Sequence, residues 1–154
     1  MTVPHETRPL PAASVPAAIT TLRVHGLRVS TARRLVLEAL FAAEEPVTAD
    51  AIAAGLDGRL PSSDLASVYR NLDMLEEIGL VCHFHVAHGA GLYALAAQHQ
   101  AGYVACESCG AHRPLDYSTV AKIAAVLREA CGYEPQLAHF SIVGQCPECR
   151  HAHS

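Results

Sequence analysis

The chain has 154 residues, of which 51% are hydrophobic and 17% charged, and this composition excludes a disordered or fibrous protein. The length accommodates one compact domain or two small ones. No apolar run approaches the roughly 18 residues that span a bilayer. The N-terminus also lacks a signal-peptide core, so we expect a cytoplasmic protein with no membrane partner. Eleven basic and fifteen acidic side chains give a net charge of −4, which by itself argues against nucleic acid as a partner.

The N-terminal part of the chain has the periodicity of short helices separated by turn residues. A mobile, proline-rich arm is expected over residues 1–14, helices follow, and Leu80–Val86 and Leu92–Leu95 have the character of two strands around a glycine-rich turn. The first helix is expected to begin at Val15 and to end at Gly26, and the second to be capped by Ser30 or Thr31. The third is expected to be capped by Thr48 and to include Leu56. The fourth is expected to be capped by Ser62, Ser63 or Asp64 and to end at Gly79. Helices followed by a β-hairpin outline a winged helix-turn-helix over residues 15–95.

After a hinge at residues 96–100 the pattern changes to strands around one helix. The expected strands are Tyr103–Cys106, His112–Tyr117 and Gln136–Val143, and the expected helix is Ser118–Ala130, with Val120, Ile123, Val126 and Leu127 directed inward. We therefore expect a mixed α/β (α+β) chain. In it, a small α+β domain over residues 101–150 follows the winged helix, and residues 151–154 form a tail.

Two C-x-x-C units, Cys106–Cys109 and Cys146–Cys149, are separated by 36 residues. In a reducing cytoplasm such cysteines are more typical of metal ligands than of disulfides. Four thiolates complete a tetrahedral shell around Zn²⁺, and such a closed site contributes to folding rather than to catalysis. Two redox or disulfide pairs are the alternative, but a redox motif typically occurs once, ahead of a helix. Of the other two cysteines, Cys131 is expected to be a small buried side chain, and Cys82 is left open as an additional metal ligand.

Ten histidines are a high number for a chain of 154 residues, and neutral imidazole is the commonest side-chain metal ligand near neutral pH. His83 and His85 alternate on an expected strand, so both rings share one face about 6.5–7 Å apart, close enough to share a metal ion. An ordinary exposed strand face has the same spacing, and this alternative stays open. His139 is the leading candidate for a third ligand, and such a metal would fix the angle between the two domains. Of the other histidines, His88 and His99 are secondary candidates, whereas His151 and His153 are expected to be solvated.

The expected fourth helix contains the sequence Ser67-Val68-Tyr69-Arg70-Asn71. With Leu65, Val68 and Leu72 inward, its polar side chains fall on the exposed side, where Arg and Asn can read base edges and Ser and Tyr can bind phosphates. An exposed polar helix face without a ligand is the alternative. Residues 20–37 contain four arginines and no acidic residue, a local positive charge suited to phosphate contacts. The candidates for DNA contact are Arg28, Arg33, Arg34, Ser67, Tyr69, Arg70 and Asn71.

The combination of these motifs resembles the ferric-uptake-regulator (Fur) family of dimeric, metal-responsive bacterial repressors. The segments that carry the resemblance are Gly26–Arg33, Leu65–Leu72, Gly79–Val81 and the two C-x-x-C units. The resemblance implies an N-terminal winged helix, a C-terminal dimerisation domain and a structural Zn(Cys)₄ site. Gly79–Gly89 and Ala138–Cys146 look most like the nickel-responsive Nur branch, in which the positions that match His83, His85 and His139 form the nickel site.

The chain departs from the family pattern just before the first C-x-x-C unit. A histidine-rich run normal for the family is reduced here to His99, and Pro114 stands near the position of an expected Glu ligand. The family's second regulatory metal site is therefore expected to be absent or rebuilt. A three-histidine site with an open position suits Ni²⁺ or Zn²⁺ and is poor for Fe²⁺, which also disfavours the peroxide-sensing branch.

These observations predict a homodimeric transcription regulator that binds a palindromic operator in double-stranded DNA. It would hold a structural Zn²⁺ and a second divalent metal, Ni²⁺ or Zn²⁺, at the three histidines. The alternative is a Fur-like regulator that is constitutive or senses thiol oxidation, for instance at Cys82. An enzyme is not expected, because the sequence has no H-E-x-x-H motif and no H-x-E paired with P-C-x-x-C.

Overall fold

The computed structural model describes residues 9–86, 89–98, 102–137 and 141–152. The chain divides into two compact units. Unit 1 comprises Met1–His83 and Leu92–Gln98, and unit 2 comprises Phe84–Gly91 and His99–Ser154. Within the described ranges, no helix has both the length and the apolar character that crossing a membrane requires.

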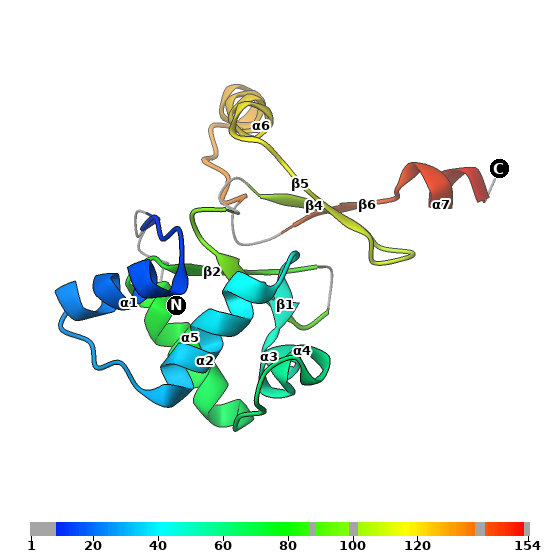
Figure 1. The fold of residues 1–154 in the computed structure, drawn as a ribbon. Coiled ribbons are helices and arrows are strands. Elements are labelled where there is room, and N and C mark those ends of the chain that lie inside the picture. The colour runs from blue at the N-terminus through cyan, green and yellow to red at the C-terminus, as the bar shows by residue number, and fades with distance from the viewer. Residues whose placement is uncertain (1–8, 87–88, 99–101, 138–140, 153–154) are drawn as a thin grey trace. The chain divides into compact units, whose positions relative to one another are not determined.

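The described part of unit 1 contains five helices and most of a three-stranded sheet (Figure 1). The helices are α1 (Val15–Val24), α2 (Thr31–Ala42), α3 (Ala49–Ala53), α4 (Gly55–Gly58) and α5 (Leu65–Glu77). The strands of this sheet are β1 (Val47–Thr48), β2 (Val81–His85) and β3 (Gly91–Leu95), in the order β1-β3-β2, and the last two residues of β2 and the first of β3 are counted in unit 2. The expected hairpin after the last helix is therefore confirmed, and β1, which the sequence did not predict, adds to it as an antiparallel edge strand.

The helix boundaries follow from side-chain caps. Ser30, Thr48 and Asp64 each accept a hydrogen bond from the backbone N–H three residues further on, which satisfies a free donor of the first turn. Helix α5 ends before Gly79, whose φ of +85° is a conformation that glycine adopts without strain. The expected caps and stops of α2, α3 and α5 are thus confirmed.

A single apolar core holds unit 1 together. Leu22, Leu37 and Leu72 have no exposed surface, and they come from α1, α2 and α5, respectively. Helix α5 packs against α2 and α3 in this core. One expected core residue, Leu65, is 37% exposed, because it is the first residue of α5 and lies beyond the covered part of the helix. The predicted third helix ends at Ala53, and buried Leu56 belongs to α4, where its φ is +51°.

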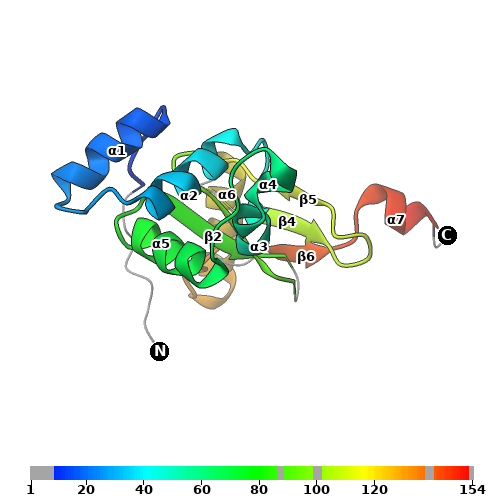
Figure 2. The same ribbon diagram turned by 60° about the horizontal axis from the view of Figure 1, so that its bottom comes forward.

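Unit 2 contains the three-stranded sheet β5-β4-β6, with β4 between its neighbours (Figure 2). The strands are β4 (Tyr103–Cys106), β5 (His112–Pro114) and β6 (Ile142–Gly144), and the helices are α6 (Tyr117–Cys131) and α7 (Pro147–Ala152). Strand β5 is antiparallel to β4, whereas β6 is parallel to it. The mixed α+β fold is confirmed. Strand β5 ends at Pro114 rather than at the expected Tyr117, and residues 138–140 of the expected strand Gln136–Val143 lie outside the described residues. Helix α7 was not predicted.

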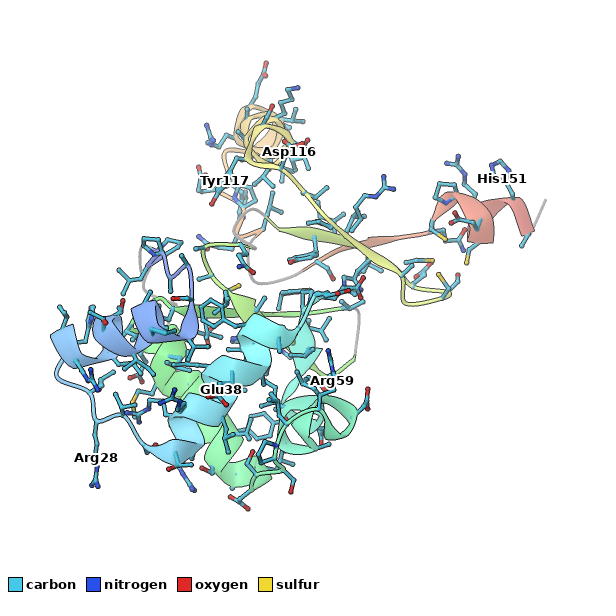
Figure 3. The ribbon with its side chains drawn as sticks, viewed as in Figure 1. Arg28, Glu38, Arg59, Asp116, Tyr117 and His151 are labelled. Carbon is cyan, nitrogen blue, oxygen red and sulfur yellow. The ribbon has the colours of Figure 1, made fainter. Side chains whose placement is uncertain are left out.

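Helix α6 begins at its cap Asp116, beside Tyr117 (Figure 3), and is largely exposed in the single chain. Its only buried residue, within the described range 102–137, is Ala124. Val126 is 63% exposed and Leu127 37% exposed, so the expectation that both point inward is wrong for one copy of the chain. Cys131 is also exposed rather than buried, because it is the last residue of α6.

Candidate functional site

The four cysteines of the two C-x-x-C units converge in unit 2. Their Sγ atoms all lie within 4.8 Å of one another, and those of Cys109 and Cys146 are 3.8 Å apart. A tetrahedral Zn²⁺ with Zn–S bonds of about 2.3 Å has sulfurs about 3.8 Å apart. The donor set and its spacing therefore fit a structural zinc ion. The other two ligands are Cys106 and Cys149.

Short turns aim these sulfurs at one point. Cys106 ends β4, and its carbonyl accepts a hydrogen bond from the N–H of Gly110, whose φ is +75°. On the other side, Cys146 precedes α7 and its sulfur accepts a hydrogen bond from the N–H of Cys149 at 3.4 Å. Each C-x-x-C unit is thus a closed turn, and β4 and β6, as adjacent parallel strands, bring the two turns together.

The thiols of Cys106 and Cys149 have pKa values shifted in opposite directions. Hydrogen bonds from the backbone of Cys146 and Cys109 lower the pKa of the Cys106 thiol to about 6. Hydrogen bonding with the neighbouring sulfurs of Cys146, Cys109 and Cys106 raises the pKa of Cys149 to about 12. The thiolate of Cys106 therefore forms readily, whereas deprotonation of Cys149 is opposed unless a cation binds beside it.

His83 lies on β2 and is hydrogen-bonded to a carboxylate of α5. Its Nδ1 is 2.5 Å from Oε1 of Glu76, and this hydrogen bond raises the pKa of His83. The sequence pattern did not indicate this carboxylate partner of His83. The turn expected at Gly79 could have indicated this contact, because it folds β2 back from the end of α5. Glu76 and His83, seven residues apart, then lie close together.

His85 is the second expected ligand, two residues further along β2. Its Nδ1 is 3.4 Å from the carbonyl oxygen of Gly89, and its own carbonyl accepts a hydrogen bond from Oγ of Ser141 at 2.7 Å. This contact joins β2 to the segment that follows His139. His139 itself lies outside the described residues, as do His88, His99 and His153.

Cys82 lies next to these histidines but is partly covered by the sheet. Its Sγ donates to the carbonyl of Ala94 at 3.8 Å, and burial raises the pKa of its thiol to about 12. The thiol is therefore protonated at neutral pH, and a protonated thiol is a poor nucleophile and a poor metal ligand.

Four of the seven candidates for DNA contact are exposed. They are Arg28, Arg34, Tyr69 and Arg70. Arg28 extends away from the chain into solvent (Figure 3), and Arg34 forms an ion pair with Glu38 on the next turn of α2 at 3.0 Å. Ser67 is half-buried in the first turn of α5. The exposed basic surface of unit 1 thus consists of Arg28 in the loop before α2, Arg34 on α2 and Arg70 on α5.

Arg33 and Asn71 are buried, each with 8% of its surface exposed. Nε of Arg33 donates to Oδ1 of Asn71 at 3.1 Å, and the guanidinium also donates to the carbonyl of Arg28. Nδ2 of Asn71 donates to the carbonyl of Ser67 at 2.8 Å. The expectation that Asn71 is on the exposed side of its helix is therefore wrong. Position 71 completes the i, i+3, i+4, i+7 pattern of Val68, Leu72 and Leu75, a signal that its polar side chain concealed.

Comparison with known proteins gives a consistent result. Residues 24–142 match the model of the ferric uptake regulator family. The peroxide-responsive repressor PerR of Staphylococcus saprophyticus is 26% identical over 133 residues, which cover 86% of this chain and 89% of the relative. The ferric uptake regulator of Helicobacter pylori has a similar fold, with a TM-score of 0.67 at 18% identity, covering 91% of this chain and 93% of that one. The Pseudomonas aeruginosa regulator, determined with manganese, has a TM-score of 0.65 at 25% identity, covering 84% and 97% of the two chains.

Proposed function

The chain belongs to the ferric uptake regulator family, and on that premise we propose that it is a homodimeric repressor whose affinity for DNA is set by nickel or zinc. Members of this family are metal-responsive DNA-binding regulators, not enzymes. In this proposal the regulator acts in the cytoplasm. Residues 15–95 are its DNA-binding domain and residues 101–150 its dimerisation domain.

One observation carries the proposal: the segment from α5 to β2 holds both kinds of functional side chain. Tyr69 and Arg70 are exposed on α5, and His83 and His85 follow on β2 after a single tight turn. A metal ion bound to the strand therefore acts on the element directly connected to the helix that reads DNA. Such a direct connection is what a metal-dependent change in DNA affinity requires.

DNA recognition is assigned to the exposed basic surface of unit 1. Arg70 is placed to reach a base edge, while Arg28, Arg34 and Tyr69 contact phosphates together with the hydroxyl of Ser67. Arg33 and Asn71 contribute by holding α5 against α2. The net charge of −4 does not exclude DNA as a partner, because phosphate contacts depend on local charge and these arginines supply local positive charge.

The two metal sites have different roles in this proposal. The four-cysteine site holds a structural Zn²⁺ and supports the fold of unit 2. His83, His85 and His139 form the sensory site, and three imidazoles favour Ni²⁺ or Zn²⁺, as in the nickel-responsive branch. The alternative of thiol sensing at Cys82 is disfavoured by the raised pKa of its thiol.

A second copy of the chain is the partner that unit 2 is built to receive. Large apolar side chains of unit 2 are exposed in the single chain: Tyr117, Val126, Leu127, Tyr133 and Val143. Pairing two copies through this surface removes apolar area from water and places two α5 helices in a two-fold arrangement, which a palindromic operator matches.

The test is the fluorescence anisotropy of a labelled DNA duplex, selected from a random-sequence pool in the presence of Ni²⁺ or Zn²⁺. We expect the affinity of the wild type to increase about 5- to 150-fold with one of the two metals, a typical coupling between sites. His85→Ala should lose this increase, while His151→Ala, an exposed histidine of α7, should keep it. An equal response of His85→Ala and wild type, or no response of the wild type to any divalent metal, would overturn the proposal.

A further inference from the structure

A carboxylate on the DNA-reading helix contacts the first sensory histidine, and both groups belong to unit 1. Oε1 of Glu76 is 2.5 Å from Nδ1 of His83, and the two side chains are 33% and 24% exposed. The contact is built by backbone hydrogen bonds at the end of α5: the N–H of Gly79 donates to Glu76, and that of Leu80 donates to Leu75. This rigid turn aligns the start of β2 with the last turn of the helix.

The hydrogen bond to Glu76 determines which nitrogen of the neutral His83 ring carries the proton. A carboxylate accepts, so Nδ1 carries the proton and Nε2 keeps the lone pair that a metal needs. Metal-binding histidines usually donate the second ring N–H in this way to a carboxylate or a backbone carbonyl. His85 has the same arrangement in weaker form, with Nδ1 3.4 Å from the carbonyl of Gly89.

The neighbours of the imidazole make Glu76 the decisive partner. Asp73 lies one turn earlier on α5 and acts on His83 through its charge, and the ring of Tyr93 on β3 lies 5.6 Å from that of His83. Glu76 is the group that forms the short hydrogen bond. Because it is six residues after Arg70 on the same helix, about 9 Å at 1.5 Å per residue, it joins the imidazole to the DNA-reading segment through continuous helix.

We propose that Glu76 is a positioning residue of the sensory site, which presents Nε2 of His83 to the metal ion and connects the bound metal to α5. The inference rests on the proposed function, since it assigns the residue through which the same site acts on DNA. The proposal assigns this role to Glu76 and not to Glu77, the next residue, which is exposed. Glu77 is the matched control.

The first readout needs no metal. Long-range ¹H–¹⁵N NMR spectra of the imidazoles report the tautomer, and the spectrum of His83→Ala assigns the signals of His83. We expect the Nδ1–H tautomer in the wild type and in Glu77→Ala, and a shift toward Nε2–H in Glu76→Ala. Glu76→Gln keeps an oxygen acceptor in place and should retain the wild-type tautomer. An unchanged tautomer in Glu76→Ala would overturn the proposal.

The second readout is the affinity for Ni²⁺, measured by titration calorimetry on zinc-loaded protein. Loss of such a supporting residue typically lowers metal affinity by about 10- to 100-fold, and we expect this loss in Glu76→Ala but not in Glu77→Ala. If the contact only stabilises the turn, Glu76→Ala will lower the melting temperature and leave Ni²⁺ affinity within twofold, which contradicts the proposal. If His83→Ala also leaves Ni²⁺ affinity unchanged, the proposed sensory site itself fails.

Discussion

Units 1 and 2 reach their folds by different means. Unit 1 has an apolar core of its own, in which Leu22, Leu37 and Leu72 are fully buried. In unit 2 the longest helix buries only Ala124, and Val126 and Tyr133 are 63% and 75% exposed. Unit 1 therefore has the apolar burial that stabilises a small domain. Unit 2 also buries apolar residues, Phe84 and Tyr103 among them, but in the proposed function it relies in addition on the four-cysteine site and on a second copy of the chain.

The largest effect is expected from loss of a zinc ligand, which should unfold unit 2 and leave unit 1 folded. Cys146→Ser removes one of four ligands, and structural zinc contributes about 10–16 kcal/mol to the folding of small zinc domains. We expect loss of the zinc ion and loss of the helical signal of unit 2, with unit 1 still folded. Metal analysis and circular dichroism measure both. Cys131→Ser is the control, because Cys131 is an exposed cysteine of α6 outside the cluster, and it should keep one zinc per chain.

A core substitution should act on unit 1 alone. Leu72→Ala leaves a cavity between α5 and α2, and we expect the free energy of unfolding of unit 1 to fall by about 2–5 kcal/mol. Leu127→Ala, on the exposed face of α6, should cost far less in the single chain and act mainly on dimer dissociation. Urea denaturation and analytical ultracentrifugation distinguish the two outcomes. Equal destabilisation by both variants would contradict the difference between the units.

A smaller effect is expected at Arg33. Arg33→Ala leaves Asn71 and the carbonyl of Arg28 without their donor, and unsatisfied buried groups cost about 1–3 kcal/mol each. We expect lower stability of unit 1 and weaker DNA binding that follows from the disturbed position of α5. Thermal denaturation measures the first effect. A variant with unchanged stability but weakened DNA binding would instead show Arg33 to be a direct DNA contact.

The smallest effect on stability is expected at the neighbouring Arg34. Its ion pair with Glu38 is exposed, and helix pairs of this kind contribute about 0.3–0.5 kcal/mol. Arg34→Ala should therefore leave the melting temperature almost unchanged. It should weaken DNA binding and reduce the salt dependence of the affinity by about one counterion, as expected for a phosphate contact. A salt dependence equal to that of the wild type would exclude Arg34 from the DNA interface.

Most helix boundaries of unit 1 could be predicted from the sequence by rules that involve only neighbouring residues. The caps Ser30, Thr48 and Asp64 and the helix stop at Gly79 were predictable because each acts on backbone groups a few residues away. The four-cysteine cluster was also predictable, since the ligand type and the repeated spacing together specify the site. The exposure of Val126 was not, because helical periodicity identifies an apolar face without telling whether the same chain or a second copy covers it.

The features that the sequence did not reveal depend on contacts between elements. Asn71 was assigned to the surface by its polarity, although its buried position is satisfied by Arg33 from another helix. The contact of Glu76 with His83 depends on the direction in which β2 leaves α5. Helix α7 is six residues long and begins at a proline within a metal-binding motif, so it carries almost no periodic signal.

Hydrogen exchange of the wild-type protein, followed by mass spectrometry before and after zinc is removed with a strong chelator, tests the division between the units most directly. We expect zinc removal to abolish the protection of amides in β4, α6 and α7, while amides in α2 and α5 keep theirs. Protection that is lost together in both units, or kept in unit 2 without zinc, would contradict it.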